Sequence, residues 1–472
     1  MAGDDRTSST ASLPTRCLTV YACYPLVVRR TGVKAALIAL VCAAASAPVA
    51  ANGEPPHVVE LASDSQTTVT AAAFADDGTL VVGGTFFGKL VVGKTRLAAR
   101  RADWQDGFVA RIDRAGKVTW LASATGDDVS AIAIGPDGAI AVAGSTSSIV
   151  GKADGPATHY RYGATLALLA ADGKLRWKRD FASSDRSWTN GVTFAGDAIV
   201  ACGAFAGTAT FNTTEVQSTI GWPGKVPTDD VFVARMTPDG KLDWFATGGG
   251  DEDDRATACA TLPSGDIAVV GTVGARATFG TVHLVGPDEA AHKRLANPLR
   301  GFVAIYAPNG ASLSALELGQ RDSARIEGVA TLADGTLIVR GGDEDVQTGA
   351  PHPFIARVVA GNVTVRDADA PTAAIVGGEL VSVRPTPGAL VVEQQFAART
   401  VTLATIAVPV KPKLELTALA ASNDGRLALV GRRGDEVEHP LGGGRIEVDL
   451  SHEHGFVALV SKPEDFSALR SR

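Results

Sequence analysis

The sequence predicts an all-β fold built from a repeated unit of four antiparallel strands. Two hairpin patterns alternate along the chain, represented by AIAIGPDGAIAVAG (from Ala131) and GFVARIDRAGKVTW (from Gly107). Each places Asp-Gly or a related turn dipeptide between two short apolar runs, which is the strongest local signal for a β-hairpin. The composition agrees, because 52 glycines and only 2 methionines in 472 residues suit tight turns and short strands.

The first hairpin pattern occurs seven times. Its copies are AAAFADDGTLVVGG (from Ala71), AIAIGPDGAIAVAG (Ala131), GVTFAGDAIVACG (Gly191), ACATLPSGDIAVVG (Ala258), GVATLADGTLIVRGG (Gly328), VSVRPTPGALVVEQ (Val381) and ALAASNDGRLALVG (Ala418). Both faces of these strands are apolar, as expected for sheets that are covered on both sides. We name the two strands of this hairpin A and B.

The second hairpin pattern alternates with the first and supplies strands C and D. Its copies are GFVARIDRAGKVTW (from Gly107), ATLALLAADGKLRW (Ala164), VFVARMTPDGKLDW (Val231), GFVAIYAPNGASLS (Gly301), PFIARVVAGNVTV (Pro353), a poor copy near RTVTLATIAV (Arg399), and GFVALVSKPEDFSA (Gly455). Seven successive four-stranded units predict a seven-bladed β-propeller. The tryptophans that recur in strand D, Trp120, Trp177 and Trp244, are interpreted as residues that pack between blades rather than as a cofactor ladder.

The first strand of the repeat region has no unit in front of it. The segment Val58 to Asp64 matches strand D of the first unit, whereas the last unit, from Ala418 to Ser461, lacks a clear strand D. We therefore expect the N-terminal strand to complete the last blade and close the ring, which removes exposed sheet edges. In the alternative, Phe466 to Leu469 supplies that strand.

The sixth unit is irregular, because Thr400 to Leu416 leaves little room for both strand C and strand D.

The pattern of Asp-Gly, an aliphatic strand ending in glycine, a loop and FVARIDRAGKVTW resembles the secreted bacterial seven-bladed β-propeller repeat family. Glycine-rich stretches such as TFFGKLVVG (from Thr85), AFAGTATFN (Ala204) and TVGARATFG (Thr272) look like the same family. The resemblance covers nearly all of the chain after the N-terminal segment, implies the fold, and carries no defined catalytic residues. The GKxxW turns also resemble quinone-cofactor propellers, but those typically have eight blades and a cofactor pocket not found here.

The N-terminal 50 residues are interpreted as a signal peptide with an over-long n-region. Basic residues precede the apolar run Ala35 to Ala50, which ends in small residues, so cleavage is expected near Ala50 or Ala51. Translation starting at Val28 would shorten the segment. RRTGVK (from Arg29) lacks the full twin-arginine pattern, and Cys42 follows a valine, which disfavours lipidation. Residues 57–470 form the predicted propeller, expected to be a secreted, periplasmic or cell-envelope monomer without a transmembrane segment.

Charge and cysteine content narrow the function classes. The net charge of -7 and the absence of a basic stripe argue against nucleic acid as a partner. Cys17 and Cys23 lie before Val28, and only Cys202 and Cys259 follow the signal segment. Cys202 matches Ala143 and Cys259 matches Ile132 in the second unit, so two buried thiols are favoured, although an exported chain also permits one disulfide.

Loop lengths predict which face of the propeller binds a ligand. The A–B and C–D turns are tight and uniform, whereas the B–C connections vary widely and the D–A connections carry charge. Variable connections on one face are the expected binding surface. The long B–C connections are Lys89 to Asp106, Lys152 to Gly163, Phe211 to Asp230, Ala275 to Arg300 and Arg432 to His454.

Acidic residues gather in the D–A connections. Asp251, Asp253 and Asp254 are weak candidates for a metal site, with calcium as the cofactor that their hard oxygens suit. The other ligand-face candidates are Asp127, Asp128, Asp185, Glu252 and Asp322. Solvated loops that favour solubility are the competing interpretation, and GGGDEDD lacks the alternating spacing of a calcium loop.

No pattern assigns catalytic residues or a cofactor. His452 and His454 lack a third ligand, and no GxSxG elbow, HExxH helix or P-loop is present. The sequence therefore favours an exported non-catalytic binding or interaction module whose ligand is a protein or a glycan. The alternative is a hydrolase or lyase that uses paired carboxylates on polysaccharide or peptide at the mouth of the channel.

Overall fold

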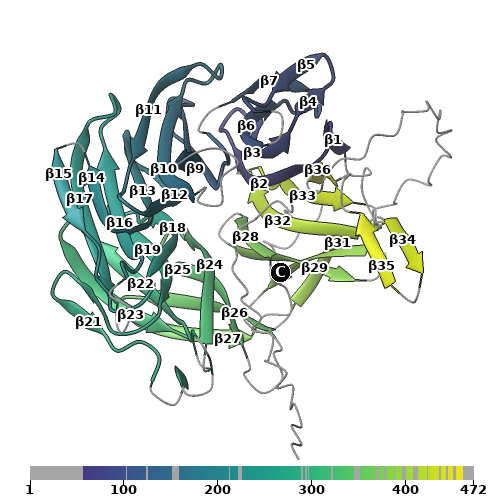
Figure 1. The fold of residues 1–472 in the computed structure, drawn as a ribbon. Helices are drawn as coiled ribbons and strands as arrows, with labels where there is room; N and C mark the ends of the chain where they lie inside the picture. Colours follow the sequence, from purple (N-terminus) through teal and green to yellow (C-terminus); the bar gives the residue numbers. More distant parts are fainter. Residues whose placement is uncertain are drawn as a thin grey trace, which may run out of the picture. The chain divides into compact units, whose positions relative to one another are not determined.

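The computed structural model describes most of residues 57–460 (Figure 1). The chain divides into two compact units, Met1–Ser46 and Ala47–Arg472, and every described element belongs to the second. The described part omits residues 1–56, 102–103, 124–125, 151–158, 212, 222–225, 289–290, 293–294, 296, 320, 322, 345–350, 368–371, 377–378, 387–388, 396–399, 408–412, 423, 435–436, 443–444, 450–452 and 461–472. The predicted signal peptide lies outside it.

The described strands include seven antiparallel units of four strands, which we call blades 1 to 7; two of these units belong to six-stranded sheets. Blade 1 contains β2 (Thr67–Phe74), β3 (Leu80–Phe87), β6 (Gln105–Ile112) and β7 (Val118–Ala122). Blade 2 contains β8 (Ala131–Ile134), β9 (Ile140–Val150), β10 (His159–Leu169) and β11 (Leu175–Phe181). Blade 3 contains β12 (Arg186–Ala195), β13 (Ala198–Ala206), β16 (Asp230–Met236) and β17 (Leu242–Gly250). Blade 4 contains β18 (Arg255–Thr261), β19 (Ile267–Val273), β22 (Arg300–Tyr306) and β23 (Ser312–Leu318).

The remaining blades repeat the same order. Blade 5 contains β24 (Ser323–Thr331), β25 (Leu337–Glu344), β26 (Pro351–Val359) and β27 (Asn362–Asp367). Blade 6 contains β28 (Thr372–Val376), β29 (Glu379–Thr386), β30 (Ala389–Gln395) and β31 (Thr400–Ala407). Blade 7 contains β32 (Lys413–Ala421), β33 (Leu427–Gly434), β36 (Glu453–Val460) and β1 (His57–Ser63). The predicted seven-bladed β-propeller is confirmed.

The N-terminal strand closes blade 7, as predicted. Strand β1 pairs antiparallel with β36, with Val59 opposite Val457 and Leu61 opposite Gly455 (Figure 1). Leu61 is completely buried in an apolar cluster that also contains residues of blade 1. The alternative final strand, residues 466–469, lies outside the described residues.

The prediction for the sixth unit was wrong by one strand. VSVRPTPGALVVEQ was assigned to strands A and B, but it forms β29 and β30, which are strands B and C. Strand A is β28, whose Thr372 pairs with Val383, and the weak copy near Arg399 contributes only strand D. A turn between two apolar runs identifies a hairpin but not its position in the sheet, because that position depends on pairing with further strands.

The glycine-rich stretches form additional hairpins in the B–C connections. β4 (Lys89–Val92) and β5 (Thr95–Ala98) extend blade 7 by pairing with β1, and β20 (Ala277–Phe279) and β21 (Val282–Leu284) extend blade 3 by pairing with β17. Thus each of these hairpins covers the outer edge of the preceding blade. Two further hairpins are β14 (Thr208–Phe211) with β15 (Thr214–Gln217), and β34 (Val437–Gly442) with β35 (Arg445–Asp449).

The A strands of successive blades are joined by polar side chains. Asn190 Nδ2 donates to the carbonyl of Ala256 in the next blade at 2.8 Å, and hydroxyls at the equivalent position of three other blades do the same. In three of these strands the residue sits at a β-bulge. The other donors are Thr70 to Val129, Ser130 to Thr189, and Thr417 to Val69 across the closing seam. A bulge re-aims one side chain, which here reaches the next blade.

Replacing Thr417 with valine is expected to lower the free energy of unfolding by about 1 kcal/mol, because the carbonyl of Val69 loses its hydroxyl donor while side-chain volume is kept. Chemical denaturation measures the change. Thr119→Val is the matched control, since the exposed Thr119 hydroxyl bonds to Arg111 within its own blade. Equal losses in the two variants would contradict a specific role for the inter-blade bond.

The tryptophans of strand D pack between blades, as interpreted from the sequence. The indole N–H groups of Trp120, Trp177 and Trp244 donate to the carbonyls of Ala171, Pro238 and Pro308, at 3.2, 2.8 and 2.8 Å. Each acceptor lies in the C–D turn of the next blade. These repeated contacts therefore join the blades at the end where the C–D turns lie.

No helix among the described residues has the length and apolar character needed to cross a membrane.

Candidate functional site

The D–A connections carry the predicted ligand-face acids. Asp127 and Asp128 lie between β7 and β8, Asp185 between β11 and β12, and Asp251 to Asp254 between β17 and β18. Asp322 lies outside the described residues. These acids differ in their exposure to solvent and in the hydrogen bonds and ion pairs that they make.

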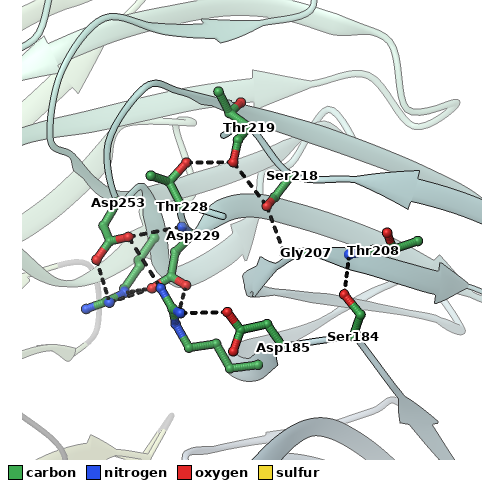
Figure 2. A network of polar contacts seen from close by, with 11 residues as sticks. Ser184, Asp185, Gly207, Thr208, Ser218, Thr219, Thr228, Asp229 and Asp253 are labelled. Atoms are coloured by element: carbon green, nitrogen blue, oxygen red, sulfur yellow. Dashed lines mark hydrogen bonds and ion pairs between the residues drawn. The ribbon is translucent and has the colours of Figure 1, made fainter. Parts of the chain in front are cut away.

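A buried carboxylate that sequence reasoning missed, Asp229, is the centre of a polar network between blades 3 and 4 (Figure 2). Its side chain is 0% exposed and lies between two arginines: Arg186 Nε is 2.8 Å from Oδ1 and Arg255 Nη2 is 2.5 Å from Oδ2. Burial raises the pKa of Asp229, and the two arginines oppose that shift. The carboxylate therefore fixes two guanidinium groups that come from the A strands of neighbouring blades.

Two of the predicted acids belong to this network (Figure 2). Asp253 accepts the backbone N–H of Asp229 at 3.1 Å and lies 3.1 Å from Arg255 Nη2, and Asp185 lies 3.0 Å from Arg186 Nη1. The side chain of Arg186 is 27% exposed and that of Arg255 is 47% exposed. Each guanidinium group therefore contacts the buried Asp229 and also reaches solvent. The arrangement presents two positive groups in fixed positions, with a carboxylate beside each.

An aromatic pair adjoins the exposed arginine. The guanidinium carbon of Arg255 lies 5.6 Å from the ring centre of Trp188, within the range of a cation–π contact. Trp188 in turn lies 6.3 Å from Tyr162 of blade 2. These contacts further restrict the orientation of Arg255.

Asp230 and Asp254 form a second, buried layer beneath the network. Both oxygens of Asp254 accept backbone N–H groups, from Gly250 at 2.6 Å and Gly274 at 3.0 Å. Asp230 Oδ2 accepts from the backbone and hydroxyl of Thr219, whereas Oδ1 has no hydrogen-bond partner among the residues that the structure describes. Burial, reinforced by the neighbouring carboxylates, raises the pKa of Asp230 to about 6 and that of Asp254 to about 8.

The two acids of the first D–A connection are held inside the protein. Asp127 is 4% exposed and accepts from Arg100 at 2.9 Å, from the Trp104 indole at 3.0 Å and from the backbone of Ser147 at 2.7 Å. Asp128 accepts both the backbone N–H and the hydroxyl of Ser145, and burial raises its pKa to about 6. Asp127 therefore links the B–C connection of blade 1 to β9 of blade 2, and Asp128 binds Ser145 on the same strand β9.

The proposed calcium ligands do not converge. Asp251 is exposed, Asp253 is paired with arginine, and Asp254 uses both oxygens for backbone N–H groups. Across the described ranges, no group of three or more His, Cys, Asp or Glu side chains could hold a metal ion. The carboxylate of Glu252 lies 4.0 Å from His292 Nδ1, and burial raises the pKa of Glu252. Of the two histidines in SHEHG, His452 lies outside the described residues.

One sequence signal for the missed residues was present. Asp106 and Asp230 stand at the same place, immediately before GFVARI and VFVARM, and both bind the B–C connection that precedes them. Asp106 accepts the backbone and side chain of Arg100 just as Asp230 accepts those of Thr219. Comparison of the C strands, rather than of the loops alone, would have selected these acids.

Replacing Asp254 with asparagine is expected to make thermal stability less sensitive to a rise in pH between the ordinary pKa of 3.8 and the folded pKa of about 8. The folded pKa of about 8 exceeds the ordinary value of 3.8, so the stability from proton binding is present at low pH and lost as pH rises towards 8. The melting temperature of the unmodified protein should therefore fall relative to the variant between pH 5 and 9. The exposed Asp251→Asn is the control, and a pH-independent difference for Asp254→Asn would contradict the assignment.

Comparisons with known proteins add no argument to the strand pairing that defines the fold. No protein-family model matches the chain, and no curated protein matches it. Solved structures that resemble it include the propeller of Dos1 (8% identity, TM-score 0.38, covering 85% of this chain and 95% of that one). Others are the WD40 propeller domain of Doa1 (8%, 0.41, 86% and 98%) and the propeller domain of the trilobed protease from Pyrococcus furiosus (8%, 0.43, 86% and 97%). At these values the likenesses carry no argument about activity.

Proposed function

We propose that the protein is a non-catalytic binding module that recognises a protein partner through the face formed by the D–A and B–C connections. The observation that carries the proposal is the pair Arg186 and Arg255, both partly exposed and held by the fully buried Asp229. A charged group held in place before binding loses little conformational freedom when a ligand arrives. Arginine is also enriched among the residues that dominate protein interfaces.

An exposed apolar pair lies in a loop that approaches the D–A connection of the same network. Ile220 is 51% exposed and Val226 57%, and both lie in the B–C connection of blade 3. The backbone N–H of Gly221 donates to the Val226 carbonyl at 3.0 Å, and a Cβ at Gly221 would come 2.8 Å from the Asp251 carbonyl. The loop therefore stands against the D–A connection of the arginine network. Anchored arginines next to exposed aliphatic side chains match the composition of protein-binding surfaces.

The alternative function, a hydrolase or lyase at this face, gains no support from these contacts. Acid–base catalysis of glycoside cleavage needs two carboxyl groups that face the same substrate bond. Asp253 is paired with arginine, Asp254 is bound to two backbone N–H groups, and Asp127 accepts from three residues. These three of the predicted carboxyl groups are therefore committed to holding the loops.

Capture from an envelope extract, quantified across matched variants, tests the proposed function. Immobilised protein should retain at least one component that Arg255→Gln and Ile220→Asp each retain about tenfold less. Leu175→Asp is the matched control for the second variant, because Leu175 is 55% exposed and lies on strand D of blade 2. Circular dichroism confirms that all three variants fold.

Two outcomes would reject the proposal. Equal retention by all variants would place binding elsewhere, and turnover of an oligosaccharide or peptide that Asp253→Asn abolishes would favour the enzyme. In parallel, the shift in melting temperature is recorded with calcium and with oligosaccharides. A specific shift with either would replace the protein partner with that ligand.

We further propose that the protein is an exported member of the secreted bacterial propeller repeats. The support is the N-terminal segment, in which basic residues precede the apolar run Ala35 to Ala50. Fusing residues 1–56 to a reporter that is active only outside the cytoplasm tests export. A reporter signal equal to that of a leaderless fusion would contradict it.

A further inference from the structure

The two cysteines that follow the N-terminal segment lie against each other at the seam between blades 3 and 4. Cys202 is on β13 and Cys259 on β18, and these strands of neighbouring blades are in contact. Their exposed fractions are 0% and 8%, and both belong to the same apolar cluster. Both are free thiols in this structure.

The side chains of the two cysteines point towards one another. The Cys259 thiol faces β13, where it lies 3.7 Å from the carbonyl of Val200, two residues before Cys202. The Cys202 sulfur faces β18: a Cβ added at Gly191 would lie 2.8 Å from Cys202 Sγ and 3.0 Å from the backbone N of Cys259. Glycine at position 191 therefore leaves the room in which the sulfur of blade 3 approaches the backbone of blade 4.

The electrostatic environment agrees with a thiol–thiol contact. Burial raises the pKa of Cys202 well above its ordinary value, and contact with the Cys259 thiol raises it further. Inside the closed fold the Cys202 thiol is thus protonated, and both thiols are shielded by burial, so the pair reacts slowly with external oxidants. Oxidation is expected to be fastest before the two blades close on each other.

The positions of the two cysteines are equivalent to a contact pair at another seam. Gly83 in blade 1 and Ile132 in blade 2 occupy the corresponding places, and a Cβ at Gly83 would lie 2.7 Å from Ile132 Cδ1. The repeat itself therefore brings these two positions together across a seam. At the seam between blades 3 and 4 both positions are cysteine.

We propose that Cys202 and Cys259 form an inter-blade disulfide when the protein folds in the presence of a disulfide-bearing oxidant. One thiolate attacks the oxidant's disulfide, which forms a mixed disulfide and releases one thiol. The second cysteine then attacks the protein sulfur of that mixed disulfide and releases the oxidant's second thiol. Two protons and two electrons leave the protein, and the new S–S bond ties blade 3 to blade 4.

Peptide mapping of the full chain after refolding from the reduced, denatured state in a glutathione redox buffer tests the proposal. Alkylation before and after reduction distinguishes free thiols from disulfide-bonded ones, and the peptide masses distinguish Cys202 and Cys259 from Cys17, Cys23 and Cys42. We expect a linked peptide pair containing Cys202 and Cys259 in most molecules. Recovery of both cysteines as free thiols in folded protein would overturn the proposal, and this readout needs no variant.

Sensitivity to a reductant provides the second measurement. A bond that closes a long loop restricts the unfolded chain, so reduction is expected to lower the melting temperature by about 5 °C. Cys202→Ala and Cys259→Ala should each abolish that response, whatever their own effect on packing. A melting temperature unaffected by reductant in the unmodified protein, or a response that persists in both variants, would overturn the proposal.

Discussion

Replacing Gly240 with alanine is expected to lower the free energy of unfolding by about 3 kcal/mol. Two effects combine at this position. The φ angle of +77° is in the left-handed region that glycine adopts without strain, and an added Cβ would lie 2.7 Å from Cδ2 of Trp177. The ring has little freedom to move away, because its N–H donates to the carbonyl of Pro238 at 2.8 Å.

Gly335→Ala separates the two effects in the Gly240 experiment. Gly335 has a similar φ of +83°, but nothing lies within 4 Å of an added Cβ, so only the backbone cost of about 1 kcal/mol is expected. Urea denaturation of both variants gives the difference. Equal losses would show that the contact between the tryptophan and the next blade's turn contributes little. If Gly240→Ala loses more stability, the same is expected of alanine at Gly173 and Gly310, where an added Cβ would meet the rings of Trp120 and Trp244.

Replacing Leu61 with alanine is expected to cost about 3 kcal/mol, because the side chain is completely buried where β1 completes blade 7. Its apolar cluster includes Val457 of the same blade and Val69 and Leu80 of blade 1. Loss of this side chain therefore weakens the seam that joins the two ends of the repeat. Thermal and urea unfolding, followed by tryptophan fluorescence, measure the change.

Val58→Ala is the control on the same strand. Val58 is 49% exposed, so its truncation is expected to cost less than about 0.5 kcal/mol. If another segment closed the ring and β1 were only an added outer strand, Leu61→Ala would cost as little as Val58→Ala. That result would reject closure by the N-terminal strand.

The closure of blade 7 could be predicted because the evidence was local. Val58 to Asp64 matches a D strand, and the last unit lacks a clear one, so a comparison of repeats assigns the missing strand. Blade 6 could not be assigned in this way. Its hairpin from Val381 to Gln394 resembles an A–B pair, but β28 precedes it and converts it into a B–C pair.

The acids of the D–A connections illustrate the same limit at the candidate site. Their location follows from the order of strands, and the sequence predicted it. Their environments depend on residues from other connections and blades: Asp127 is bound by Arg100, and Asp253 lies against Arg186 and Arg255. No loop motif indicated that Asp229, rather than the GGGDEDD run, would be the buried centre.

By itself, the sequence determined the seven-fold repeat, the antiparallel hairpins, the inter-blade tryptophans and the closing strand, because turn chemistry and apolar alternation act between near neighbours. Only the tertiary structure decided which carboxylates are buried against arginines and which side chains remain exposed. It also decided that Cys202 meets Cys259 across a seam. The physical reason is that burial and charge pairing are properties of contacts between blades, and residues distant in sequence make those contacts.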